Sequence, residues 1–136
     1  MRKTAANSVV WFDMGAMPFF LGFTMSEKAF DEKMKLMKVD NPPSFLINNS
    51  AGTTHHFTRK NGLDTAIITI DLKQAKKNCR EVVYGLLVHE AVHVLDYLIE
   101  SMNDKSPSHE FKAYTVQGIS QFLFQNYKLA LLKSTV

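Results

Sequence analysis

The sequence predicts an α+β fold in which a small antiparallel sheet packs on a central helix and on a long C-terminal helix. A β-branched run at residues 66–70 has the composition of a strand, and two long helical stretches follow at about 80–99 and 107–132. The chain has 136 residues, so we expect a single domain that spans residues 1–136. Apolar residues make up 46% of the chain and charged residues 21%, which excludes a disordered or collagen-like protein.

The first half of the chain alternates strand and turn signals around one helix. Thr24 and Glu27 form a capping-box pattern, which predicts a helix from Thr24 to about Val39 that ends before the Asn-Pro-Pro sequence at 41–43. A short strand is expected at 44–47 and a turn at 48–52.

A hairpin is expected after that turn. Residues 53–59 have the pattern of a second strand, and Lys60-Asn61-Gly62 contains an Asn-Gly hairpin signal. The strongest strand follows at 66–70, and the Lys-rich segment 71–78 is expected to be a short helix or a loop. Ser106 and Pro107 have the residue types that begin a helix, which predicts the start of the C-terminal helix.

The N-terminus and the overall charge limit the classes of function. Met1-Arg2-Lys3 followed by the apolar stretch 9–23 has the outline of a signal peptide, but Asp13 and Pro18 interrupt it and no cleavage pattern follows. No segment has the ~20 uncharged apolar residues of a membrane span, so we expect a buried strand or turn of a soluble protein. The formal net charge of +3 is too weak to predict nucleic-acid binding.

The cysteine content points to a reducing compartment. Cys79 is the single cysteine, which excludes a disulfide framework and a cysteine-built zinc finger.

The chemistry lies in the sequence His89-Glu90-Ala91-Val92-His93. Residues four apart share one helix face, so the two imidazoles can bind one Zn²⁺ through their nitrogens. Glu90 is offset by about 100° from His89, where a general base for a metal-bound water belongs. With five His in 136 residues, random placement gives roughly 0.01 matches to this motif. Because the helix is apolar on nearly every side, we expect it to be central to the domain. The alternative to a zinc site is a pair of core histidines that hydrogen-bond to the backbone.

A catalytic zinc takes three protein ligands, so a third must come from elsewhere. Glu100 lies about 10 Å along the axis from His93 and cannot reach the metal. Asp104, His109 and Glu110 are the candidates in the next element. Glu110 is preferred, whereas Asp104 is expected in the turn and His109 on the surface. This assignment requires that the first long helix end near residues 98–101 or that the two helices cross steeply.

Further residues near the site have two interpretations each. Tyr114 could donate a hydrogen bond to a ligand carboxylate or to an oxyanion, or it could be a core tyrosine with its hydroxyl at the rim. His55 and His56 should point to opposite faces of a strand, and both are expected on the surface unless one of them lies near the cleft. Residues 66–71 are the candidate edge strand along which a peptide substrate would lie.

Two segments carry a resemblance to a known family. The run from Glu81 to His93 resembles short zinc-metallopeptidase-like proteins encoded by tailed bacteriophages and prophages, and so does the run from Glu110 to Gln117. The wider class is the gluzincins, so the resemblance implies a minimal zincin-like fold, with His89, His93 and Glu110 as zinc ligands and Glu90 as catalytic base. It also implies the cytoplasm of a bacterial host as the location. A contribution of Asp96 to the site stays open.

Two functions therefore compete. The first is a zinc-dependent peptidase, a hydrolase acting on a peptide or protein substrate. The second is a non-catalytic, zinc-stabilised phage accessory or assembly protein. Only about 26 residues follow Glu110. We therefore expect a shallow groove, and either limited selectivity or a protein partner that completes the site.

Overall fold

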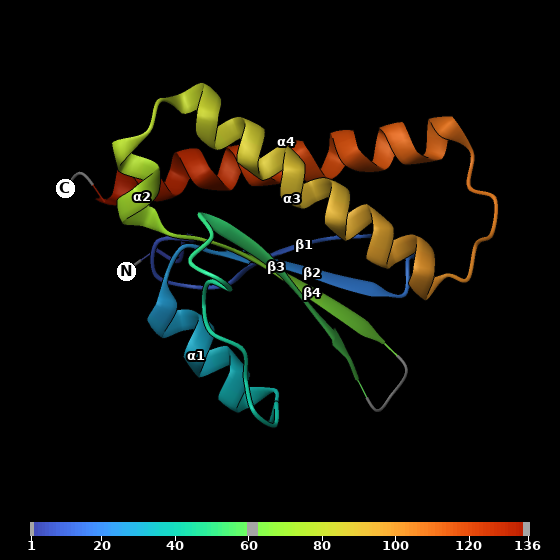
Figure 1. The fold of residues 1–136 in the computed structure, drawn as a ribbon, viewed down its shortest axis with the longest axis horizontal. Coiled ribbons are helices and arrows are strands. Elements are labelled where there is room, and N and C mark those ends of the chain that lie inside the picture. The colour runs from blue at the N-terminus through green and yellow to red at the C-terminus, as the bar shows by residue number, and fades with distance from the viewer. Residues whose placement is uncertain (1, 60–62, 135–136) are drawn as a thin grey trace.

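The computed structural model describes residues 2–59 and 63–134 and shows a four-stranded sheet with helices on both faces (Figure 1). The α+β class predicted from the sequence is confirmed. In chain order, the elements are β1 (Val10–Phe12), β2 (Phe19–Thr24), α1 (Glu27–Leu36), β3 (Gly52–Thr58), β4 (Asp64–Ile70), α2 (Leu72–Lys77), α3 (Arg80–Ser101) and α4 (His109–Ser134).

The sheet has the strand order β1-β2-β4-β3, and it is mixed. β1 pairs with β2 and β3 pairs with β4 in antiparallel fashion, but β2 and β4 are parallel, with Phe23 opposite Ile68. The expectation of an antiparallel sheet is therefore wrong for the central pair. The chain leaves β2, passes through α1 on one face, and returns through β3, so that β4 runs in the same direction as β2.

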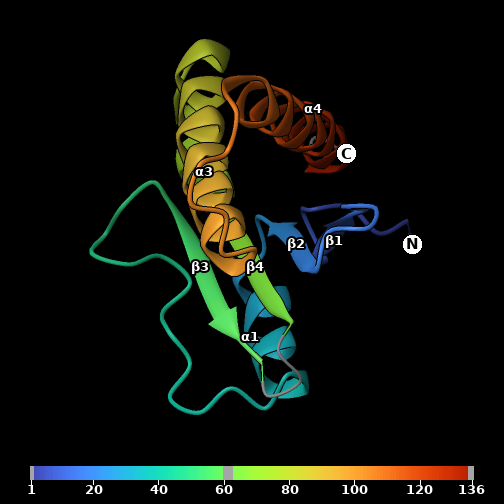
Figure 2. The ribbon, with the colours of Figure 1, turned by 90° about the vertical axis from the view of Figure 1, so that its right-hand side faces the viewer.

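Two apolar cores lie on opposite faces of the sheet. The larger core lies between the sheet and the helices α3 and α4, and it includes Leu21, Ile68 and Leu87. The smaller core lies under α1, where Phe30 packs near Ile67. Figure 2 shows α1 on one side of the strands and α3 with α4 on the other. Alternate residues of β4 therefore point to different cores, as the two-residue period of a strand requires.

The first helix is shorter than predicted at both ends. Thr24 belongs to β2, and the helix cap is Ser26, whose hydroxyl accepts a hydrogen bond from the amide of Ala29 at 3.1 Å. The helix ends at Leu36 because Lys38 adopts a left-handed conformation with φ of 55°, so it stops before the proline pair.

The segment 44–47 does not form the predicted strand. Its backbone bonds to side chains: the Phe45 carbonyl accepts a hydrogen bond from the Thr69 hydroxyl at 2.6 Å. The two strands that flank the hairpin signal at 60–62 pair as expected, while the signal itself lies outside the described residues.

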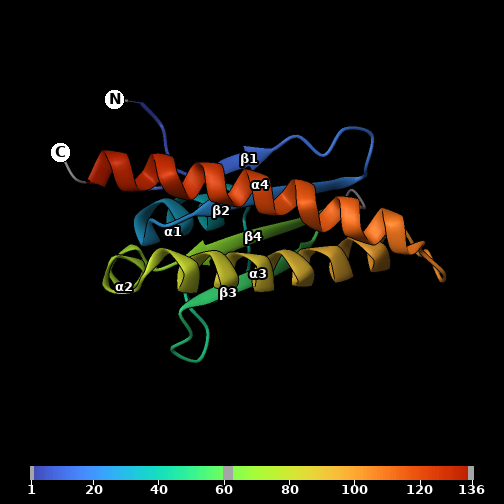
Figure 3. The ribbon, with the colours of Figure 1, turned by 90° about the horizontal axis from the view of Figure 1, so that it is seen from above.

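The two long helices follow the prediction closely. α3 ends at Ser101, within the predicted limits. α4 begins at His109, where the hydroxyl of Ser108 accepts a hydrogen bond from the Phe111 amide at 3.0 Å, so Ser106 is not the cap. Figure 3 shows α3 on the β3 side and α4 on the β1 side of the molecule.

The helix α3 is apolar around its circumference but is not buried on all sides. Val83, Leu87, Ala91, Val94 and Leu98 are buried, whereas the opposite face is open to solvent, which corrects the expectation of a central helix. Among the described residues, α3 is the one helix long and apolar enough to cross a membrane by length and composition, with a mean hydropathy of 1.5 and 39% of that stretch buried. The expectation that no segment has the length and composition of a membrane span is therefore wrong for α3. Core helices of soluble proteins pass the same test, so this finding is weak evidence for a membrane span.

Candidate metal centre

The two histidines of the motif are in hydrogen-bonding contact through their rings. Their Nε2 atoms lie 3.2 Å apart, and their ring planes make an angle of 74°. Two nitrogens bound to one tetrahedral zinc at about 2.0–2.1 Å would be separated by about 3.3 Å. His89 and His93 therefore already have the spacing of two zinc ligands. Both side chains lie on the exposed face of α3, so the alternative of buried core histidines is not what the structure has.

Glu90 points to the other side of this helix face, toward the sheet. Its side chain is only 4% exposed, and its Oε1 accepts a hydrogen bond from the Thr54 hydroxyl at 2.8 Å. The same hydroxyl lies 3.3 Å from the Glu90 backbone carbonyl. A carboxylate held this way keeps one direction, which a general base requires.

The three motif residues line one open groove between α3 and β3. Its volume is about 260 Å³. The described residues that line it are Ile47, Ser50, Gly52, Thr53, Thr54, His89, Glu90, His93 and Tyr97. Gly52 lets the strand pass close to the core, because a Cβ there would lie 2.5 Å from Ile70 Cδ1. The groove is small and shallow, as the short chain predicts.

The open edge of the sheet beside this groove is β3. β4 is paired on both sides, with β2 and with β3, so residues 66–71 cannot offer an edge to a peptide. The candidate edge predicted from the sequence is therefore wrong by one strand. The strand order decides this, and the strand order depends on pairings between distant segments.

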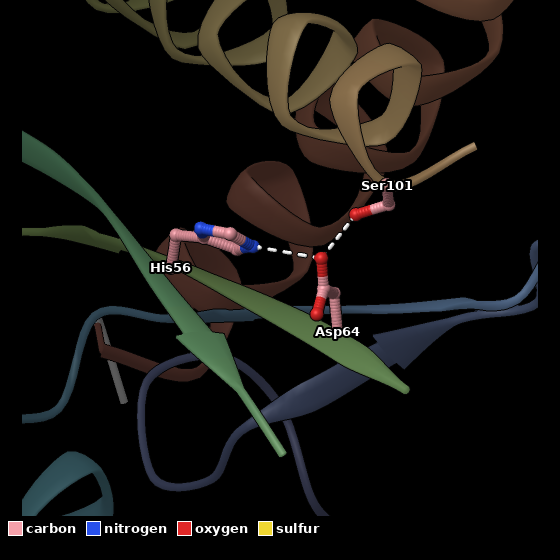
Figure 4. A network of polar contacts seen from close by, with 3 residues as sticks. All are labelled: His56, Asp64 and Ser101. Carbon is pink, nitrogen blue, oxygen red and sulfur yellow. Dashed lines mark hydrogen bonds and ion pairs between the residues drawn. The ribbon is translucent and has the colours of Figure 1, made fainter. Parts of the chain in front are cut away.

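A polar network joins the C-terminal end of α3 to the sheet, as Figure 4 shows. Ser101, the last residue of α3, donates a hydrogen bond to the Asp64 carboxylate, and His56 Nε2 lies 3.2 Å from the same oxygen. The hydrogen bond from Ser101, aided by the one from His56, lowers the pKa of Asp64 below its ordinary value, against the effect of burial. The network ties the end of α3 to the β3–β4 pair.

The ring of Tyr97 connects this network to the groove. It stacks on the His56 ring at 4.3 Å between centroids, and it lines the groove with the motif residues. The sequence interpretation missed Tyr97, although its position four residues after His93 places it on the same helix face. His56 contacts the groove residue Tyr97 but does not itself line the groove, so its role in the site stays a prediction.

His55 points to the opposite face, as the strand period predicts. It is 3% exposed, and its Nε2 lies 3.0 Å from the Phe45 carbonyl. The expectation of a surface role is therefore wrong for His55. Burial lowers its pKa, and the hydrogen bond to Phe45 opposes that effect.

Glu110 is not brought to the histidine pair. It is exposed in the first turn of α4, which starts beyond the C-terminal end of α3 (Figure 1). Ser101, the last residue of α3, already lies about 12 Å along the helix axis from His93, and Glu110 follows it in the chain. Within residues 2–59 and 63–134, no three His, Cys, Asp or Glu side chains are arranged to hold one metal ion. Glu110 as third ligand stays a prediction, and it requires a different position of the start of α4.

The other predicted residues also lie away from the groove. Tyr114 is exposed and lines a separate pocket of about 340 Å³ beside β1, with Phe12 among its neighbours. Asp96, Asp104 and His109 are exposed. Asp104 lies in the connection between α3 and α4, where a turn is expected, and His109 is on the surface as expected.

Comparison with known protein families, with curated proteins and with solved structures finds no match for this chain. The functional argument therefore rests on the geometry of the groove.

Proposed function

We propose that the protein is a zinc-dependent peptidase whose site is the groove between α3 and β3. The observation that carries the proposal is the 3.2 Å separation of the His89 and His93 Nε2 atoms, together with the Glu90 carboxylate in the same groove. This donor set suits zinc, which prefers imidazole nitrogens, and it leaves positions open for water and for a further ligand.

The residues of the chain would divide the work as follows. His89 and His93 hold the ion, which when bound polarises a carbonyl and lowers the pKa of its water. Glu90 accepts the proton of the attacking water and delivers it to the leaving amine. Thr54 keeps the Glu90 carboxylate aimed into the groove through the 2.8 Å hydrogen bond.

The substrate would be an extended peptide that pairs with the open edge of β3. Main-chain hydrogen bonds to an edge strand give affinity for many sequences, and pockets along the strand give selectivity. Ile47, Val88 and Val92 are exposed, and they would contact apolar side chains of the substrate or a protein partner that completes the site. The third ligand is part of the proposal: it is Glu110 after a movement of α4, or it comes from the partner.

The test uses Glu90→Gln, with Glu100→Gln as an exposed control on the same helix. We expect Glu90→Gln to keep bound zinc and to lose cleavage of a peptide library, whereas Glu100→Gln keeps both. His89→Ala and His93→Ala should lose zinc. Zinc content is measured on the purified proteins, and cleavage is measured with and without a chelator. Cleavage by Glu90→Gln at the normal rate would refute the role of Glu90.

One observation favours a second function, a non-catalytic zinc-bound accessory protein of a phage in a bacterial cytoplasm. Only two of the predicted ligands meet among the described residues, and the Glu90 carboxylate is already engaged by Thr54. In that case Glu90→Gln would leave the biological activity intact, and no chelator-sensitive cleavage would be found.

A further inference from the structure

A second cavity lies at the other end of α3, between α2, the first turn of α3 and the last turns of α4. Figures 1 and 3 both place these three segments side by side, away from the end of α3 that carries Ser101. The cavity has a volume of about 510 Å³, within the range of small-molecule sites. The described residues that line it are Ala75, Lys76, Asn78, Arg80, Tyr84, Tyr127, Lys128, Leu131 and Leu132.

The rim of this cavity is cationic. Arg80 and Lys128 line it from two different helices, and neither has an ion-pair partner among the described residues. None of the described lining residues is Asp or Glu. The charges of Arg80 and Lys128 are therefore available to an anion, and no acidic side chain among the described lining residues repels it.

The wall holds a phenol that is buried and has no hydrogen-bond partner. Tyr127 is 3% exposed, and its ring meets the Tyr84 ring at 6.1 Å in an edge-to-face arrangement. Within the described part of the chain its hydroxyl makes no hydrogen bond. The hydroxyl oxygen is not among the fully enclosed atoms that lack a partner, so it is open to the cavity that the residue lines. Burial raises the pKa of Tyr127, and the neighbouring Tyr84 raises it further, so the hydroxyl stays protonated and can donate.

The start of α3 adds a partial positive charge to the same cavity. α3 has 22 residues, and its N-cap residue Cys79 makes no side-chain hydrogen bond to the first turn. The first amides of a helix point outward without partners inside the helix, and they favour an anion. The cavity thus combines three basic side chains, Lys76, Arg80 and Lys128, with a tyrosine hydroxyl, a helix N-terminus and walls of Tyr, Leu and Ala side chains.

We propose that this cavity binds an amphipathic carboxylate, with its head group between Arg80, Lys128 and Tyr127 and its alkyl chain against Tyr84 and Leu131. A free inorganic anion would leave the apolar walls exposed, and an uncharged apolar molecule would leave the cations and the hydroxyl without a partner. The site shares no lining residue with the groove at His89, so it stands independently of the peptidase proposal.

The test measures binding of sodium octanoate by calorimetry, with 1-octanol as the uncharged probe of the same length. Octanoate should bind with one site per chain, more tightly than octanol, and less tightly as salt is added. The double variant Arg80→Gln, Lys128→Gln should weaken octanoate binding on the order of tenfold and leave octanol binding unchanged. Lys35→Gln, Lys105→Gln is the matched control, because both lysines are exposed and line other surfaces.

The variant Tyr127→Phe tests the tyrosine hydroxyl by itself. It keeps the ring that fills the wall, so it should fold normally and weaken octanoate binding several-fold. Equal affinities of octanoate and octanol would overturn the anion site. Absence of saturable octanoate binding, or equal weakening by the matched control, would overturn the proposal as a whole.

Discussion

Replacing Thr54 with valine removes one hydroxyl group and keeps the shape of the side chain, so it isolates the hydrogen bond between β3 and Glu90. The hydroxyl donates to a carboxylate oxygen at 2.8 Å, and the carboxylate is 4% exposed. A hydrogen bond to a charged group contributes about 1.5–3 kcal/mol, because the group left behind must stay buried without its partner. We expect Thr54→Val to lower the free energy of unfolding by about 2 kcal/mol.

A matched control is available in the same sheet. Thr65 is 1% exposed, and within the described residues its hydroxyl has no hydrogen-bond partner. Thr65→Val makes the same chemical change without breaking a hydrogen bond, so it should leave the free energy of unfolding unchanged or raise it by about 0–1 kcal/mol.

The assay is thermal and urea unfolding of both variants and the parent protein at neutral pH. For a domain of this size, about 2 kcal/mol corresponds to a decrease in Tm of roughly 8 °C. The double-mutant cycle of Thr54→Val with Glu90→Gln measures how much of the loss depends on the charge of the carboxylate, because an amide oxygen still accepts the hydrogen bond. Equal changes in Tm for Thr54→Val and Thr65→Val would refute the reasoning, since the hydrogen bond to Glu90 would then contribute nothing measurable.

Three further predictions concern glycine positions, the core and pH. Gly52→Ala should destabilise the protein by about 1–3 kcal/mol, because its new Cβ would lie 2.5 Å from Cδ1 of the buried Ile70. A Cβ added at Gly85 has nothing within 4 Å, so Gly85→Ala should stabilise α3 by up to about 1 kcal/mol. Urea unfolding measures the free energy of unfolding of both glycine variants, and a Gly85→Ala protein less stable than the Gly52→Ala protein would contradict the packing. Leu87→Ala should cost about 2–5 kcal/mol in the same assay, because Leu87 is fully buried, and a loss below about 1 kcal/mol would contradict its place in the core. Burial lowers the pKa of His55 below its ordinary 6.5, so the unfolded chain binds the proton at a higher pH than the folded chain does. The free energy of unfolding should therefore fall as the pH drops below 6.5. If the parent protein and His55→Phe showed the same pH dependence in this range, this prediction would be wrong.

The sequence predicts those features that depend on neighbouring residues. The run at 66–70 became β4, and the helix with the motif has nearly the predicted bounds. The spacing of His89 and His93 follows from the helix period alone, so the convergence of their rings needs no tertiary information. Local spacing therefore predicts the contact between the two histidines of the candidate site.

The features that depend on distant pairings were missed. The parallel pairing of β2 with β4 places β3 at the edge, and a strand pattern contains no information on which strand will be its neighbour. A helix that is apolar all round does not show which face the sheet will cover, so the sequence could not decide that the face with the two histidines would stay open to solvent. The position of Glu110 was inferred from helix lengths, and the connection after Ser101 places it at the far end of α3 instead.

The location of the histidine pair bears on the choice between the two proposed functions. His89 and His93 lie on consecutive turns of one helix, so an ion held by these two alone links no separate segments of the chain. A structural zinc stabilises small proteins because its ligands come from different segments, which cannot approach one another without folding. The two described core clusters hold α3 on the sheet, and neither histidine belongs to them. With these two ligands alone, chelation should therefore leave the fold in place. A large fall in Tm on chelation would instead imply a ligand from another element, such as Glu110, and the cleavage assay on Glu90→Gln would then decide between the two functions.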